Sequence, residues 1–330
     1  MTAPAPTLPE PLRAPCPVCG NAAGNTVLVG REMMFGTRER FRYGACAACG
    51  LLWLLDVPAD LSPYYPADYY SFGAAERPGA LKRSLRRVWA RHHLSRPTAL
   101  GALLTRAYGA APFFGWVRNA GATFTSRILD VGSGEGRLLR EMRSCGFTDL
   151  TGADPFVGAE RTDGGVRILK KAPGEIDGAY DLVMCHHAFE HMPDPAGNLL
   201  AMRRLVAPGG TLLVRIPVAD SWARRHYGAD WVALDPPRHL YIHTQRSIEL
   251  LAAGAGLEIA RAERDAGAMS LWASEQYRLD IPLNDARSYR VNPSAAPFTA
   301  GQIAGFEARA RELNAAGEGD TAAFYLRPVA

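Results

Sequence analysis

A short strand, a glycine-rich turn and the start of a helix follow one another in residues 128–142, ILDVGSGEGRLLREM. This order is typical of α/β folds that hold a nucleotide-like ligand beyond the carboxyl ends of parallel strands. The dinucleotide fingerprint G-x-G-x-x-G would need its third glycine at the position of Arg137. The turn therefore predicts an α/β fold with a nucleotide-like ligand, and it disfavours a nicotinamide dinucleotide.

An acidic residue directly before this turn narrows the choice of ligand. Asp130 would repel a pyrophosphate, but its carboxylate suits the ammonium group of S-adenosylmethionine. Asp154 ends a second strand, in residues 149–156, where its carboxylate could accept hydrogen bonds from both ribose hydroxyls. Since enzymes that use NAD carry an acid at this second position as well, the preference for S-adenosylmethionine depends on Asp130 and the turn.

The segments that follow complete a pattern known from one enzyme family. Residues 180–195 predict a fourth strand, buried on both faces, that opens into a loop and a helix. Residues 205–217 predict a helix end, a Pro-Gly-Gly turn and a fifth strand. Over about residues 127–261 the sequence resembles class I S-adenosylmethionine-dependent methyltransferases. The resemblance implies a Rossmann-like seven-stranded α/β sheet in the order 3-2-1-4-5-7-6, with strand 7 antiparallel. In this sequence, strand 3 would be residues 166–169, strand 6 residues 257–261 and strand 7 residues 322–328.

The same resemblance implies where the cofactor would bind. The glycine turn would pass under its methionine part, Asp130 would face the ammonium, and Asp154 would hold the ribose. Residues at the end of strand 4 would flank the pocket. After strand 3, no acidic residue stands at a clear adenine-binding position. The implied cofactor-binding set is Asp130, Gly132, Ser133, Gly134, Gly136, Asp154, Pro155, Cys185 and His186.

Four of the six cysteines form two identical C-x-x-C pairs, CPVCG and CAACG. In a reducing compartment this pattern favours a metal site over disulfides, and four sulfur ligands at tetrahedral corners suit a structural Zn²⁺. Residues 26–29 and 41–43 can supply the short strands of a zinc ribbon. Metal binding would supply the folding free energy that so small a core lacks. The predicted ligands are Cys16, Cys19, Cys46 and Cys49.

The 330 residues are enough for one full α/β domain and a smaller module. Residues 62–72, rich in tyrosine and proline, predict an ordered loop, and residues 302–314 predict a helix. Residues 81–93 predict a basic amphipathic helix, which either packs on the next domain, the interpretation we favour, or lies on an anionic membrane surface. The expected domains are a zinc ribbon in residues 1–57, a helical connector in 58–120 and the methyltransferase domain in 121–330, with an insert at about 264–320.

Charge and hydropathy limit the classes of partner. The net charge of +4 is too small to require nucleic acid, although ten basic residues and no acidic ones stand between Glu76 and Asp130. The first ten residues lack the pattern of a secretion signal, and the most apolar window, residues 99–117, is interrupted by a charge and a proline. We therefore expect a cytoplasmic protein, with residues 81–93 as the site of any peripheral contact with the inner membrane face.

Histidines are the natural candidates for the base that a hydroxyl acceptor requires, because their pKa lies near neutrality. His239 is the leading candidate: it lies in residues 231–244, after strand 5, where two prolines fix a rigid turn from which Arg238 and His239 would project. Alternatively, this histidine only pins its loop to the following helix. His187 comes second, in the loop after strand 4, while His191 is more typical of a residue that orients the next helix.

A four-cysteine ribbon joined to this catalytic domain resembles bacterial methyltransferases that tailor surface polysaccharides and other sugars. Their relatives, the sugar C-methyltransferases, carry a Tyr-His-Glu-His run after strand 5, and here Pro236, Pro237 and Arg238 replace all but the last residue, His239. The resemblance therefore implies O-methylation of a small-molecule or lipid-linked sugar. Three alternatives stay open: a sugar C-methyltransferase, a zinc-containing ribosomal RNA methyltransferase and a catalytically silent scaffold. Against the RNA methyltransferase, the ribbon lacks the interleaved basic and aromatic residues expected of a surface that binds RNA.

Overall fold

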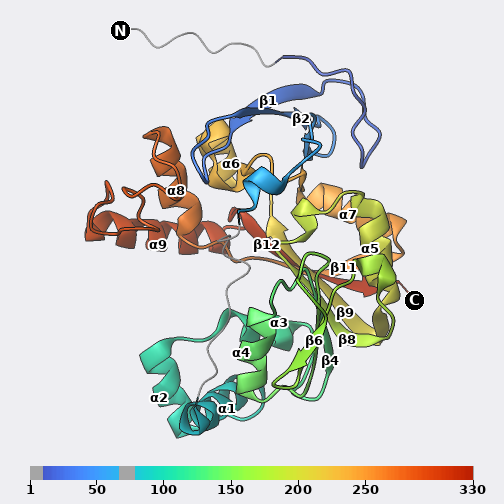
Figure 1. Ribbon diagram of the computed structural model, residues 1–330, viewed down its shortest axis with the longest axis vertical. Helices are drawn as coiled ribbons and strands as arrows, with labels where there is room; N and C mark the ends of the chain where they lie inside the picture. The colour runs from blue at the N-terminus through green and yellow to red at the C-terminus, as the bar shows by residue number, and fades with distance from the viewer. Residues whose placement is uncertain (1–9, 67–78, 330) are drawn as a thin grey trace.

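A computed structural model describes residues 10–66 and 79–329 of the protein. Its centre is an eight-stranded sheet in the order β11-β12-β9-β8-β4-β5-β7-β6 (Figure 1). The strands of this sheet are β4 (Arg127–Val131), β5 (Asp149–Ala153), β6 (Arg161–Asp163), β7 (Val166–Leu169), β8 (Tyr180–His186), β9 (Val206–Pro217), β11 (Leu257–Arg264) and β12 (Thr321–Pro328).

The pairing of these strands confirms the predicted topology. β4 pairs in parallel with β5 and β8, β5 with β7, and β8 with β9, whereas β12 is antiparallel to both β9 and β11. Two details differ from the prediction: β6 adds an antiparallel edge strand beside β7, and β9 begins at Val206, before the Pro-Gly-Gly run. Tyr180 pairs with Val206 and Leu182 with Thr211, so residues 207–210, which contain this run, are looped out of the ladder within the strand.

Helices cover both faces of the sheet, because successive side chains of a strand point to opposite sides. The covering helices are α3 (Pro112–Asn119), α4 (Arg137–Cys145), α5 (Pro195–Arg204) and α7 (Gln245–Gly254). Leu129 of β4 packs in the core that β4 shares with α5 and α7. Its neighbour Ile128 packs on the other face, in the core that contains α3 and α4.

A second, four-stranded sheet combines the N-terminal module with a segment of the catalytic domain. Its strands are β1 (Thr26–Arg31), β2 (Arg40–Ala45), β3 (Leu52–Leu54) and β10 (Tyr241–Ile242). β1 and β2 confirm the two strands predicted for the ribbon. β10 pairs antiparallel with β3, so strand pairing joins the predicted 1–57 module to the segment that follows β9.

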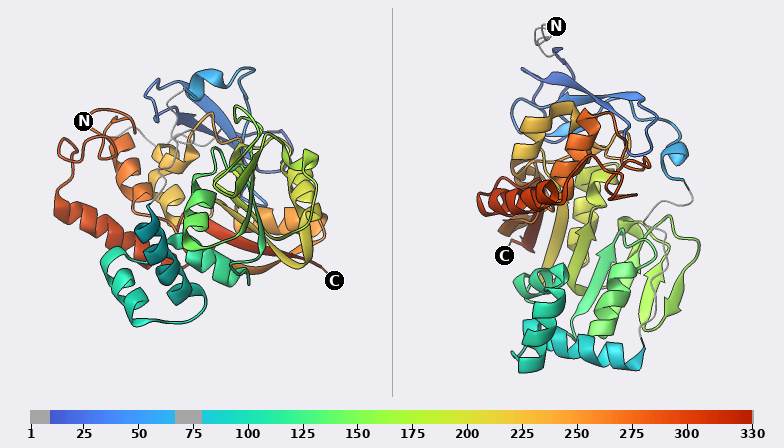
Figure 2. Two further views of the ribbon diagram at one scale, coloured as in Figure 1. Left: turned by 60° about the horizontal axis from the view of Figure 1, so that its bottom comes forward. Right: turned by 90° about the vertical axis from the view of Figure 1, so that its left-hand side faces the viewer.

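The connector forms helices at the end of the molecule opposite to β1 and β2 (Figures 1 and 2). They are α1 (Ala80–Leu94) and α2 (Ala99–Tyr108). α1 confirms the helix predicted for residues 81–93, and it packs on the catalytic domain: the Arg86 guanidinium donates to the Ser144 hydroxyl of α4 at 2.8 Å. Of the loop predicted for residues 62–72, the structure describes the short turn η1 (Ser62–Tyr64), and residues 67–72 lie outside the described residues.

The insert before the last strand forms two helices that pack against the ribbon. They are α8 (Met269–Arg278) and α9 (Ala300–Ala315), the second of which confirms the predicted helix. Leu271 of α8 shares a buried core with Tyr43 of β2 and Trp231 of the segment after β9. Insert, ribbon and this segment thus form one packed unit. Across residues 10–66 and 79–329, no helix combines the length and apolar character that a membrane span needs.

Candidate active site and four-cysteine centre

The glycine turn joins β4 to α4 and closes against the segment that follows β8. The Gly132 amide donates to the Ala153 carbonyl at 2.8 Å, and Gly132 has a φ of 76°. A Cβ atom on Gly132 would lie 2.3 Å from the Cβ atom of Ala188, so no side chain fits at this position. The turn is thereby held directly beside residues 187–191.

Asp130 lies one residue before the end of β4, with only 4% of its surface exposed. Burial, together with the nearby Asp154 carboxylate, raises the pKa of Asp130 to about 7. Within the described residues, no salt bridge or hydrogen bond compensates its buried charge. A carboxylate in this position is stabilised when a cation binds beside it, so the site fits the ammonium of S-adenosylmethionine.

Asp154 follows β5 and is fixed by backbone amides of the turn region. One carboxylate oxygen accepts a hydrogen bond from the Gly134 amide and the other from the Phe156 amide, both at 2.9 Å. Each oxygen keeps a second acceptor position, so the oriented carboxylate has capacity for two further donors, as both hydroxyls of a ribose would require. Ser133, Gly134 and Gly136 lie in the turn itself, and Pro155 follows Asp154 directly.

The last two residues of β8 point to opposite faces of the sheet. Cys185 is fully buried in the same core as Phe189 and Val214, and burial raises the pKa of its thiol well above the ordinary value. His186 packs on Trp116 of α3, with ring centroids 4.3 Å apart, and burial holds its pKa well below the ordinary value. Both side chains are therefore uncharged, and their contact with a cofactor stays a prediction.

Segment 187–191 brings a buried carboxylate to the edge of the turn. Glu190, in the turn η4 (Phe189–His191), is 1% exposed, and neither carboxylate oxygen has a hydrogen-bond partner among the described residues. His187 Nδ1 lies 3.5 Å from Glu190 Oε1, and its other nitrogen contacts Arg215. Although burial raises the pKa of Glu190, the neighbouring histidines lower it to about 2, so this carboxylate is charged.

His239 reaches the same carboxylate from residues 231–243, which we call the catalytic loop. Its Nδ1 lies 2.8 Å from the Ala233 carbonyl oxygen, a contact that fixes Nδ1 as the protonated nitrogen. Its Nε2 lies 3.9 Å from Glu190 Oε1. The structure thus brings His239 and His187, the two predicted bases, together around Glu190.

Comparison with known proteins agrees with this geometry. A family model described as a methyltransferase domain matches residues 74–262, more than half of the chain. The chain belongs to the methyltransferase domain family. It is a class I S-adenosylmethionine-dependent methyltransferase with a Rossmann-like fold.

Curated relatives include the ubiquinone biosynthesis O-methyltransferase of Bordetella avium, 34% identical over 164 residues, which are 43% of this chain and 67% of the relative. The protein of the same name from Sodalis glossinidius is 35% identical over 137 residues, 37% of this chain and 54% of the relative. The methyltransferase therefore spans about 54 to 67% of the length of these relatives. A solved S-adenosylmethionine-dependent methyltransferase from Mesorhizobium loti superposes with a TM-score of 0.42 at 16% identity, over 66% of this chain and 98% of that chain.

The methyltransferase buries an ion-pair network behind His239. Arg238 is fully buried, whereas the sequence predicted that it projects from the turn. The reason is that two carboxylates surround it: its guanidinium contacts Asp235 at 2.6 and 2.9 Å and Glu32 of the ribbon at 2.8 Å. Glu32 also accepts hydrogen bonds from three backbone amides of the ribbon, at 3.0 to 3.1 Å. Arg238 therefore ties the catalytic loop of the methyltransferase to its ribbon.

Sequence patterns did not single out Glu190, Glu32 or Asp235. Each is an isolated acidic residue in its own segment, and tertiary contacts alone bring it to its partner; Glu32 and Arg238 are 206 positions apart. The one available signal was proximity along the chain. Glu190 directly precedes a histidine, and Asp235 stands three residues before Arg238, within the loop already expected to contact substrate.

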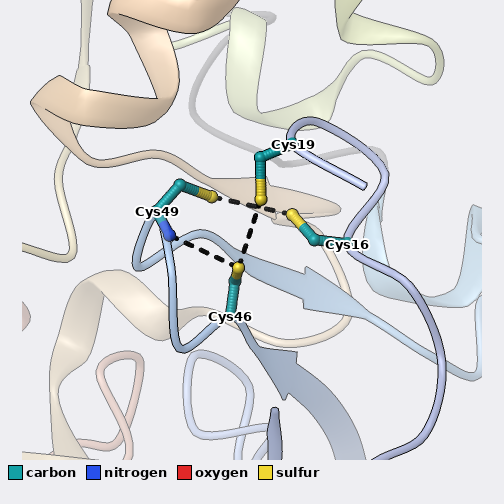
Figure 3. Close-up of side chains that lie close together, drawn as sticks. All are labelled: Cys16, Cys19, Cys46 and Cys49. Atoms are coloured by element: carbon teal, nitrogen blue, oxygen red, sulfur yellow. Dashed lines mark hydrogen bonds between the residues drawn. The ribbon is translucent and has the colours of Figure 1, made fainter. Parts of the chain in front are cut away.

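The four predicted zinc ligands meet at one point of the methyltransferase's ribbon (Figure 3). The Sγ atoms of Cys16 and Cys49 are 3.6 Å apart, those of Cys19 and Cys46 are 3.5 Å apart, and all four lie within 4.8 Å of one another. A tetrahedral Zn²⁺ with Zn–S bonds of about 2.3 Å requires separations of about 3.8 Å, so the thiols fit such an ion. Four sulfur ligands would leave no open position on such an ion, as in structural zinc sites.

This centre is bonded to Thr244, the residue that directly follows the catalytic loop. The Thr244 hydroxyl, at the start of α7, donates to the Cys49 carbonyl at 2.5 Å. The buried Tyr43 hydroxyl of β2 donates to the His239 carbonyl at 2.8 Å. Together with the pairing of β3 and β10, these bonds make the ribbon the support on which His239 is positioned.

Proposed function

We propose that this methyltransferase transfers the methyl group of S-adenosylmethionine to a hydroxyl oxygen of a sugar or lipid-linked sugar, with His239 as the base. The observation that carries the proposal is the orientation of His239. Its Nδ1 is occupied by the Ala233 carbonyl at 2.8 Å, so Nε2 keeps its lone pair. Nε2 faces Glu190 at 3.9 Å, and that negative charge stabilises the imidazolium that forms when the hydroxyl loses its proton.

The chain's own residues then have two tasks, alignment and removal of one proton. Bound S-adenosylmethionine supplies an electrophilic methyl group on sulfur, which the acceptor oxygen attacks in line. Asp130 holds the ammonium and Asp154 the ribose in this proposal. Gly132, in contact with Ala188, keeps the turn beside the segment that carries Glu190. The hydroxyl proton passes to His239 Nε2.

Two observations support oxygen as the acceptor atom. The curated relatives are named O-methyltransferases, a name that indicates no sugar. Carbon methylation requires the removal of a proton from carbon. The sugar C-methyltransferases carry a Tyr-His-Glu-His run after strand 5, and this chain has only its last residue, His239. The sugar itself rests on the resemblance to ribbon-bearing, sugar-tailoring methyltransferases.

The test is incubation of the purified chain with S-adenosylmethionine labelled in the methyl group and with an extract of the producing cell. Label in a glycan or glycolipid supports the proposal, whereas label in ribosomal RNA replaces it with RNA methylation. His239→Gln should lower the initial rate by about 10² to 10⁴-fold, the usual contribution of a general base. His226→Gln is the matched control, because His226 stacks on Trp222, away from the cluster. Equal rates for both variants would remove His239 from the chemistry.

We also infer that the connector contacts an anionic membrane, where a lipid-linked acceptor would lie. Leu81 of α1 and Leu103 and Tyr108 of α2 are 76%, 62% and 78% exposed, within a stretch rich in arginine and free of acidic residues. Wild-type protein should sediment with vesicles that contain phosphatidylglycerol and not with pure phosphatidylcholine, and Leu103→Gln should weaken this binding. Equal sedimentation with both kinds of vesicle, or with neither, would refute the contact.

A further inference from the structure

Three side chains at the active site form a second metal-ligand set, separate from the four cysteines. Glu190, His191 and His239 each present one ligand atom, and these atoms all lie within 4.8 Å of one another. Two of the residues come from η4 and the third from the catalytic loop. Two imidazoles and one carboxylate are a donor set typical of divalent transition metals, and such a set leaves coordination positions open.

Both histidines are oriented by hydrogen bonds to the backbone. Nδ1 of His191 lies 2.8 Å from the Arg238 carbonyl oxygen, and Nδ1 of His239 lies 2.8 Å from the Ala233 carbonyl oxygen. Because a carbonyl oxygen can only accept, each Nδ1 carries the proton and each Nε2 keeps its lone pair. Metal-ligating histidines characteristically have this second contact, which fixes the tautomer and the ring orientation.

The third ligand, Glu190, is a buried carboxylate. It is 1% exposed, and neither of its oxygens has a hydrogen-bond partner among the described residues. The imidazole nitrogens nearest to it are His187 Nδ1 at 3.5 Å and His239 Nε2 at 3.9 Å. A buried carboxylate normally requires a direct partner, and a divalent cation would supply one.

The spacing of one ligand pair is close to what a bound ion needs. A tetrahedral ion with bonds of about 2.1 Å to nitrogen and oxygen holds its ligand atoms about 3.4 Å apart. The distance from His239 Nε2 to Glu190 Oε1 is 3.9 Å, so a shift of about 0.5 Å brings this pair to bonding geometry.

We propose that Glu190, His191 and His239 bind one divalent transition-metal ion such as Zn²⁺, and that the bound ion inhibits methyl transfer. The inhibition rests on the proposed function, in which His239 Nε2 takes the acceptor's proton. That nitrogen has one lone pair, which forms a bond either to the metal or to the proton. Binding changes no oxidation state. Occupancy of the site withdraws the base, whereas occupancy of the four-cysteine centre does not.

The test uses the full chain with Zn²⁺ in its four-cysteine centre and Co²⁺ as the added probe. We expect one Co²⁺ per chain, with ligand-field absorption and without thiolate-to-cobalt charge-transfer bands. Glu190→Gln and His239→Gln should each weaken binding by at least about tenfold, and His191→Gln provides a third variant if one of these fails to fold. His226→Gln, outside the cluster, should bind as the wild type does.

Three results would overturn the site: no bound Co²⁺, charge-transfer bands that place it on the cysteines, or unchanged binding by the three variants. A second readout tests inhibition, because the initial rate of methyl transfer should fall in proportion to occupancy as free Zn²⁺ is raised in a metal buffer. A rate that is unaffected or rises would overturn the inhibition. If Co²⁺ binds as expected while no acceptor is ever methylated, the metal site stands and the proposed function fails.

Discussion

Replacement of Arg238 by methionine is the most direct test of how the catalytic loop is held. The Arg238 side chain is fully buried and contacts Asp235 with two nitrogens, at 2.9 and 2.6 Å, and Glu32 with one, at 2.8 Å. Methionine retains most of the apolar stem but no charge. Arg238→Met therefore leaves two buried carboxylates without their cation.

The size of the effect follows from what each carboxylate retains. Removal of one partner of a buried ion pair usually costs about 3 to 5 kcal/mol. Glu32 keeps its three backbone amide donors, so most of the cost falls on Asp235, and we expect about 3 kcal/mol of lost stability. The matched control is Arg42→Met, which breaks an ion pair with Asp56 whose side chains are 52% and 55% exposed. That loss should be at most about 1 kcal/mol.

The deficit should also depend on pH in a defined direction. Burial raises the pKa of Asp235, but Arg238 outweighs it, so the folded protein has a pKa below 3.8 at this carboxyl. Its contribution to stability is present above the unfolded pKa and is lost as the pH falls through the folded value. In Arg238→Met, burial is opposed only by His239 and His191, so the pKa of Asp235 rises relative to wild type. The deficit relative to wild type should shrink as the pH is lowered from 7, because protonation of Asp235 removes the uncompensated charge.

Urea unfolding followed by tryptophan fluorescence measures these differences, because Trp231 is buried at the start of the catalytic loop. Amide hydrogen exchange then locates the loss, which should concentrate in the ribbon and the catalytic loop rather than in β4, β5 and β8. The reasoning fails if Arg238→Met loses no more stability than Arg42→Met. It also fails if the deficit grows as the pH is lowered.

Three further predictions concern the cofactor and the metal. Asp130→Asn should weaken S-adenosylmethionine binding about tenfold or more in calorimetry. The control Asp149→Asn, at an exposed position, should bind as the wild type does. The affinity of the wild type should rise from pH 6 to 8, because the Asp130 carboxyl, whose pKa is about 7, ionises in this range. Cys49→Ser should abolish zinc binding and speed hydrogen exchange in the catalytic loop, while cofactor binding persists; loss of cofactor binding would contradict this. Gly132→Ala, at a φ of 76°, should destabilise the fold by about 1 to 3 kcal/mol in urea, whereas Gly158→Ala, with open space around it, should not.

The sheet and the ribbon cysteines were predictable because their signals are local. The apolar run of β4, the glycine turn at Gly132 and the C-x-x-C pairs each act within a few residues of the chain. The order of strands then followed from a known topology. The Pro-Gly-Gly run was predicted to precede the fifth strand, whereas β9 begins before it, and only the pairing of Val206 with β8 shows this.

The acceptor site was predictable only in part, because it depends on contacts between distant segments. His239 and His187 stood out as titratable residues in loops, but nothing in the local sequence indicated that both would face Glu190. The pairing of β10 with β3 could not be predicted either, because a strand of two residues has no recognisable sequence pattern. Arg238 looked like an exposed loop residue because its second carboxylate, Glu32, lies in another module.

The ribbon therefore supports the segment that carries His239, the base of the proposed function, and a metal that folds the ribbon would act on this segment as well. The apolar side chains of the catalytic loop, Trp231, Leu234 and Ile242, are buried in the core that contains Tyr43 of the ribbon. Without the ribbon they would be exposed to water, and the loop would lose the free energy that keeps it in one conformation. Structural zinc sites contribute about 10 to 16 kcal/mol to folding. Because the loop packs on the ribbon, metal binding that orders the ribbon would also favour the ordered conformation of the segment that carries His239.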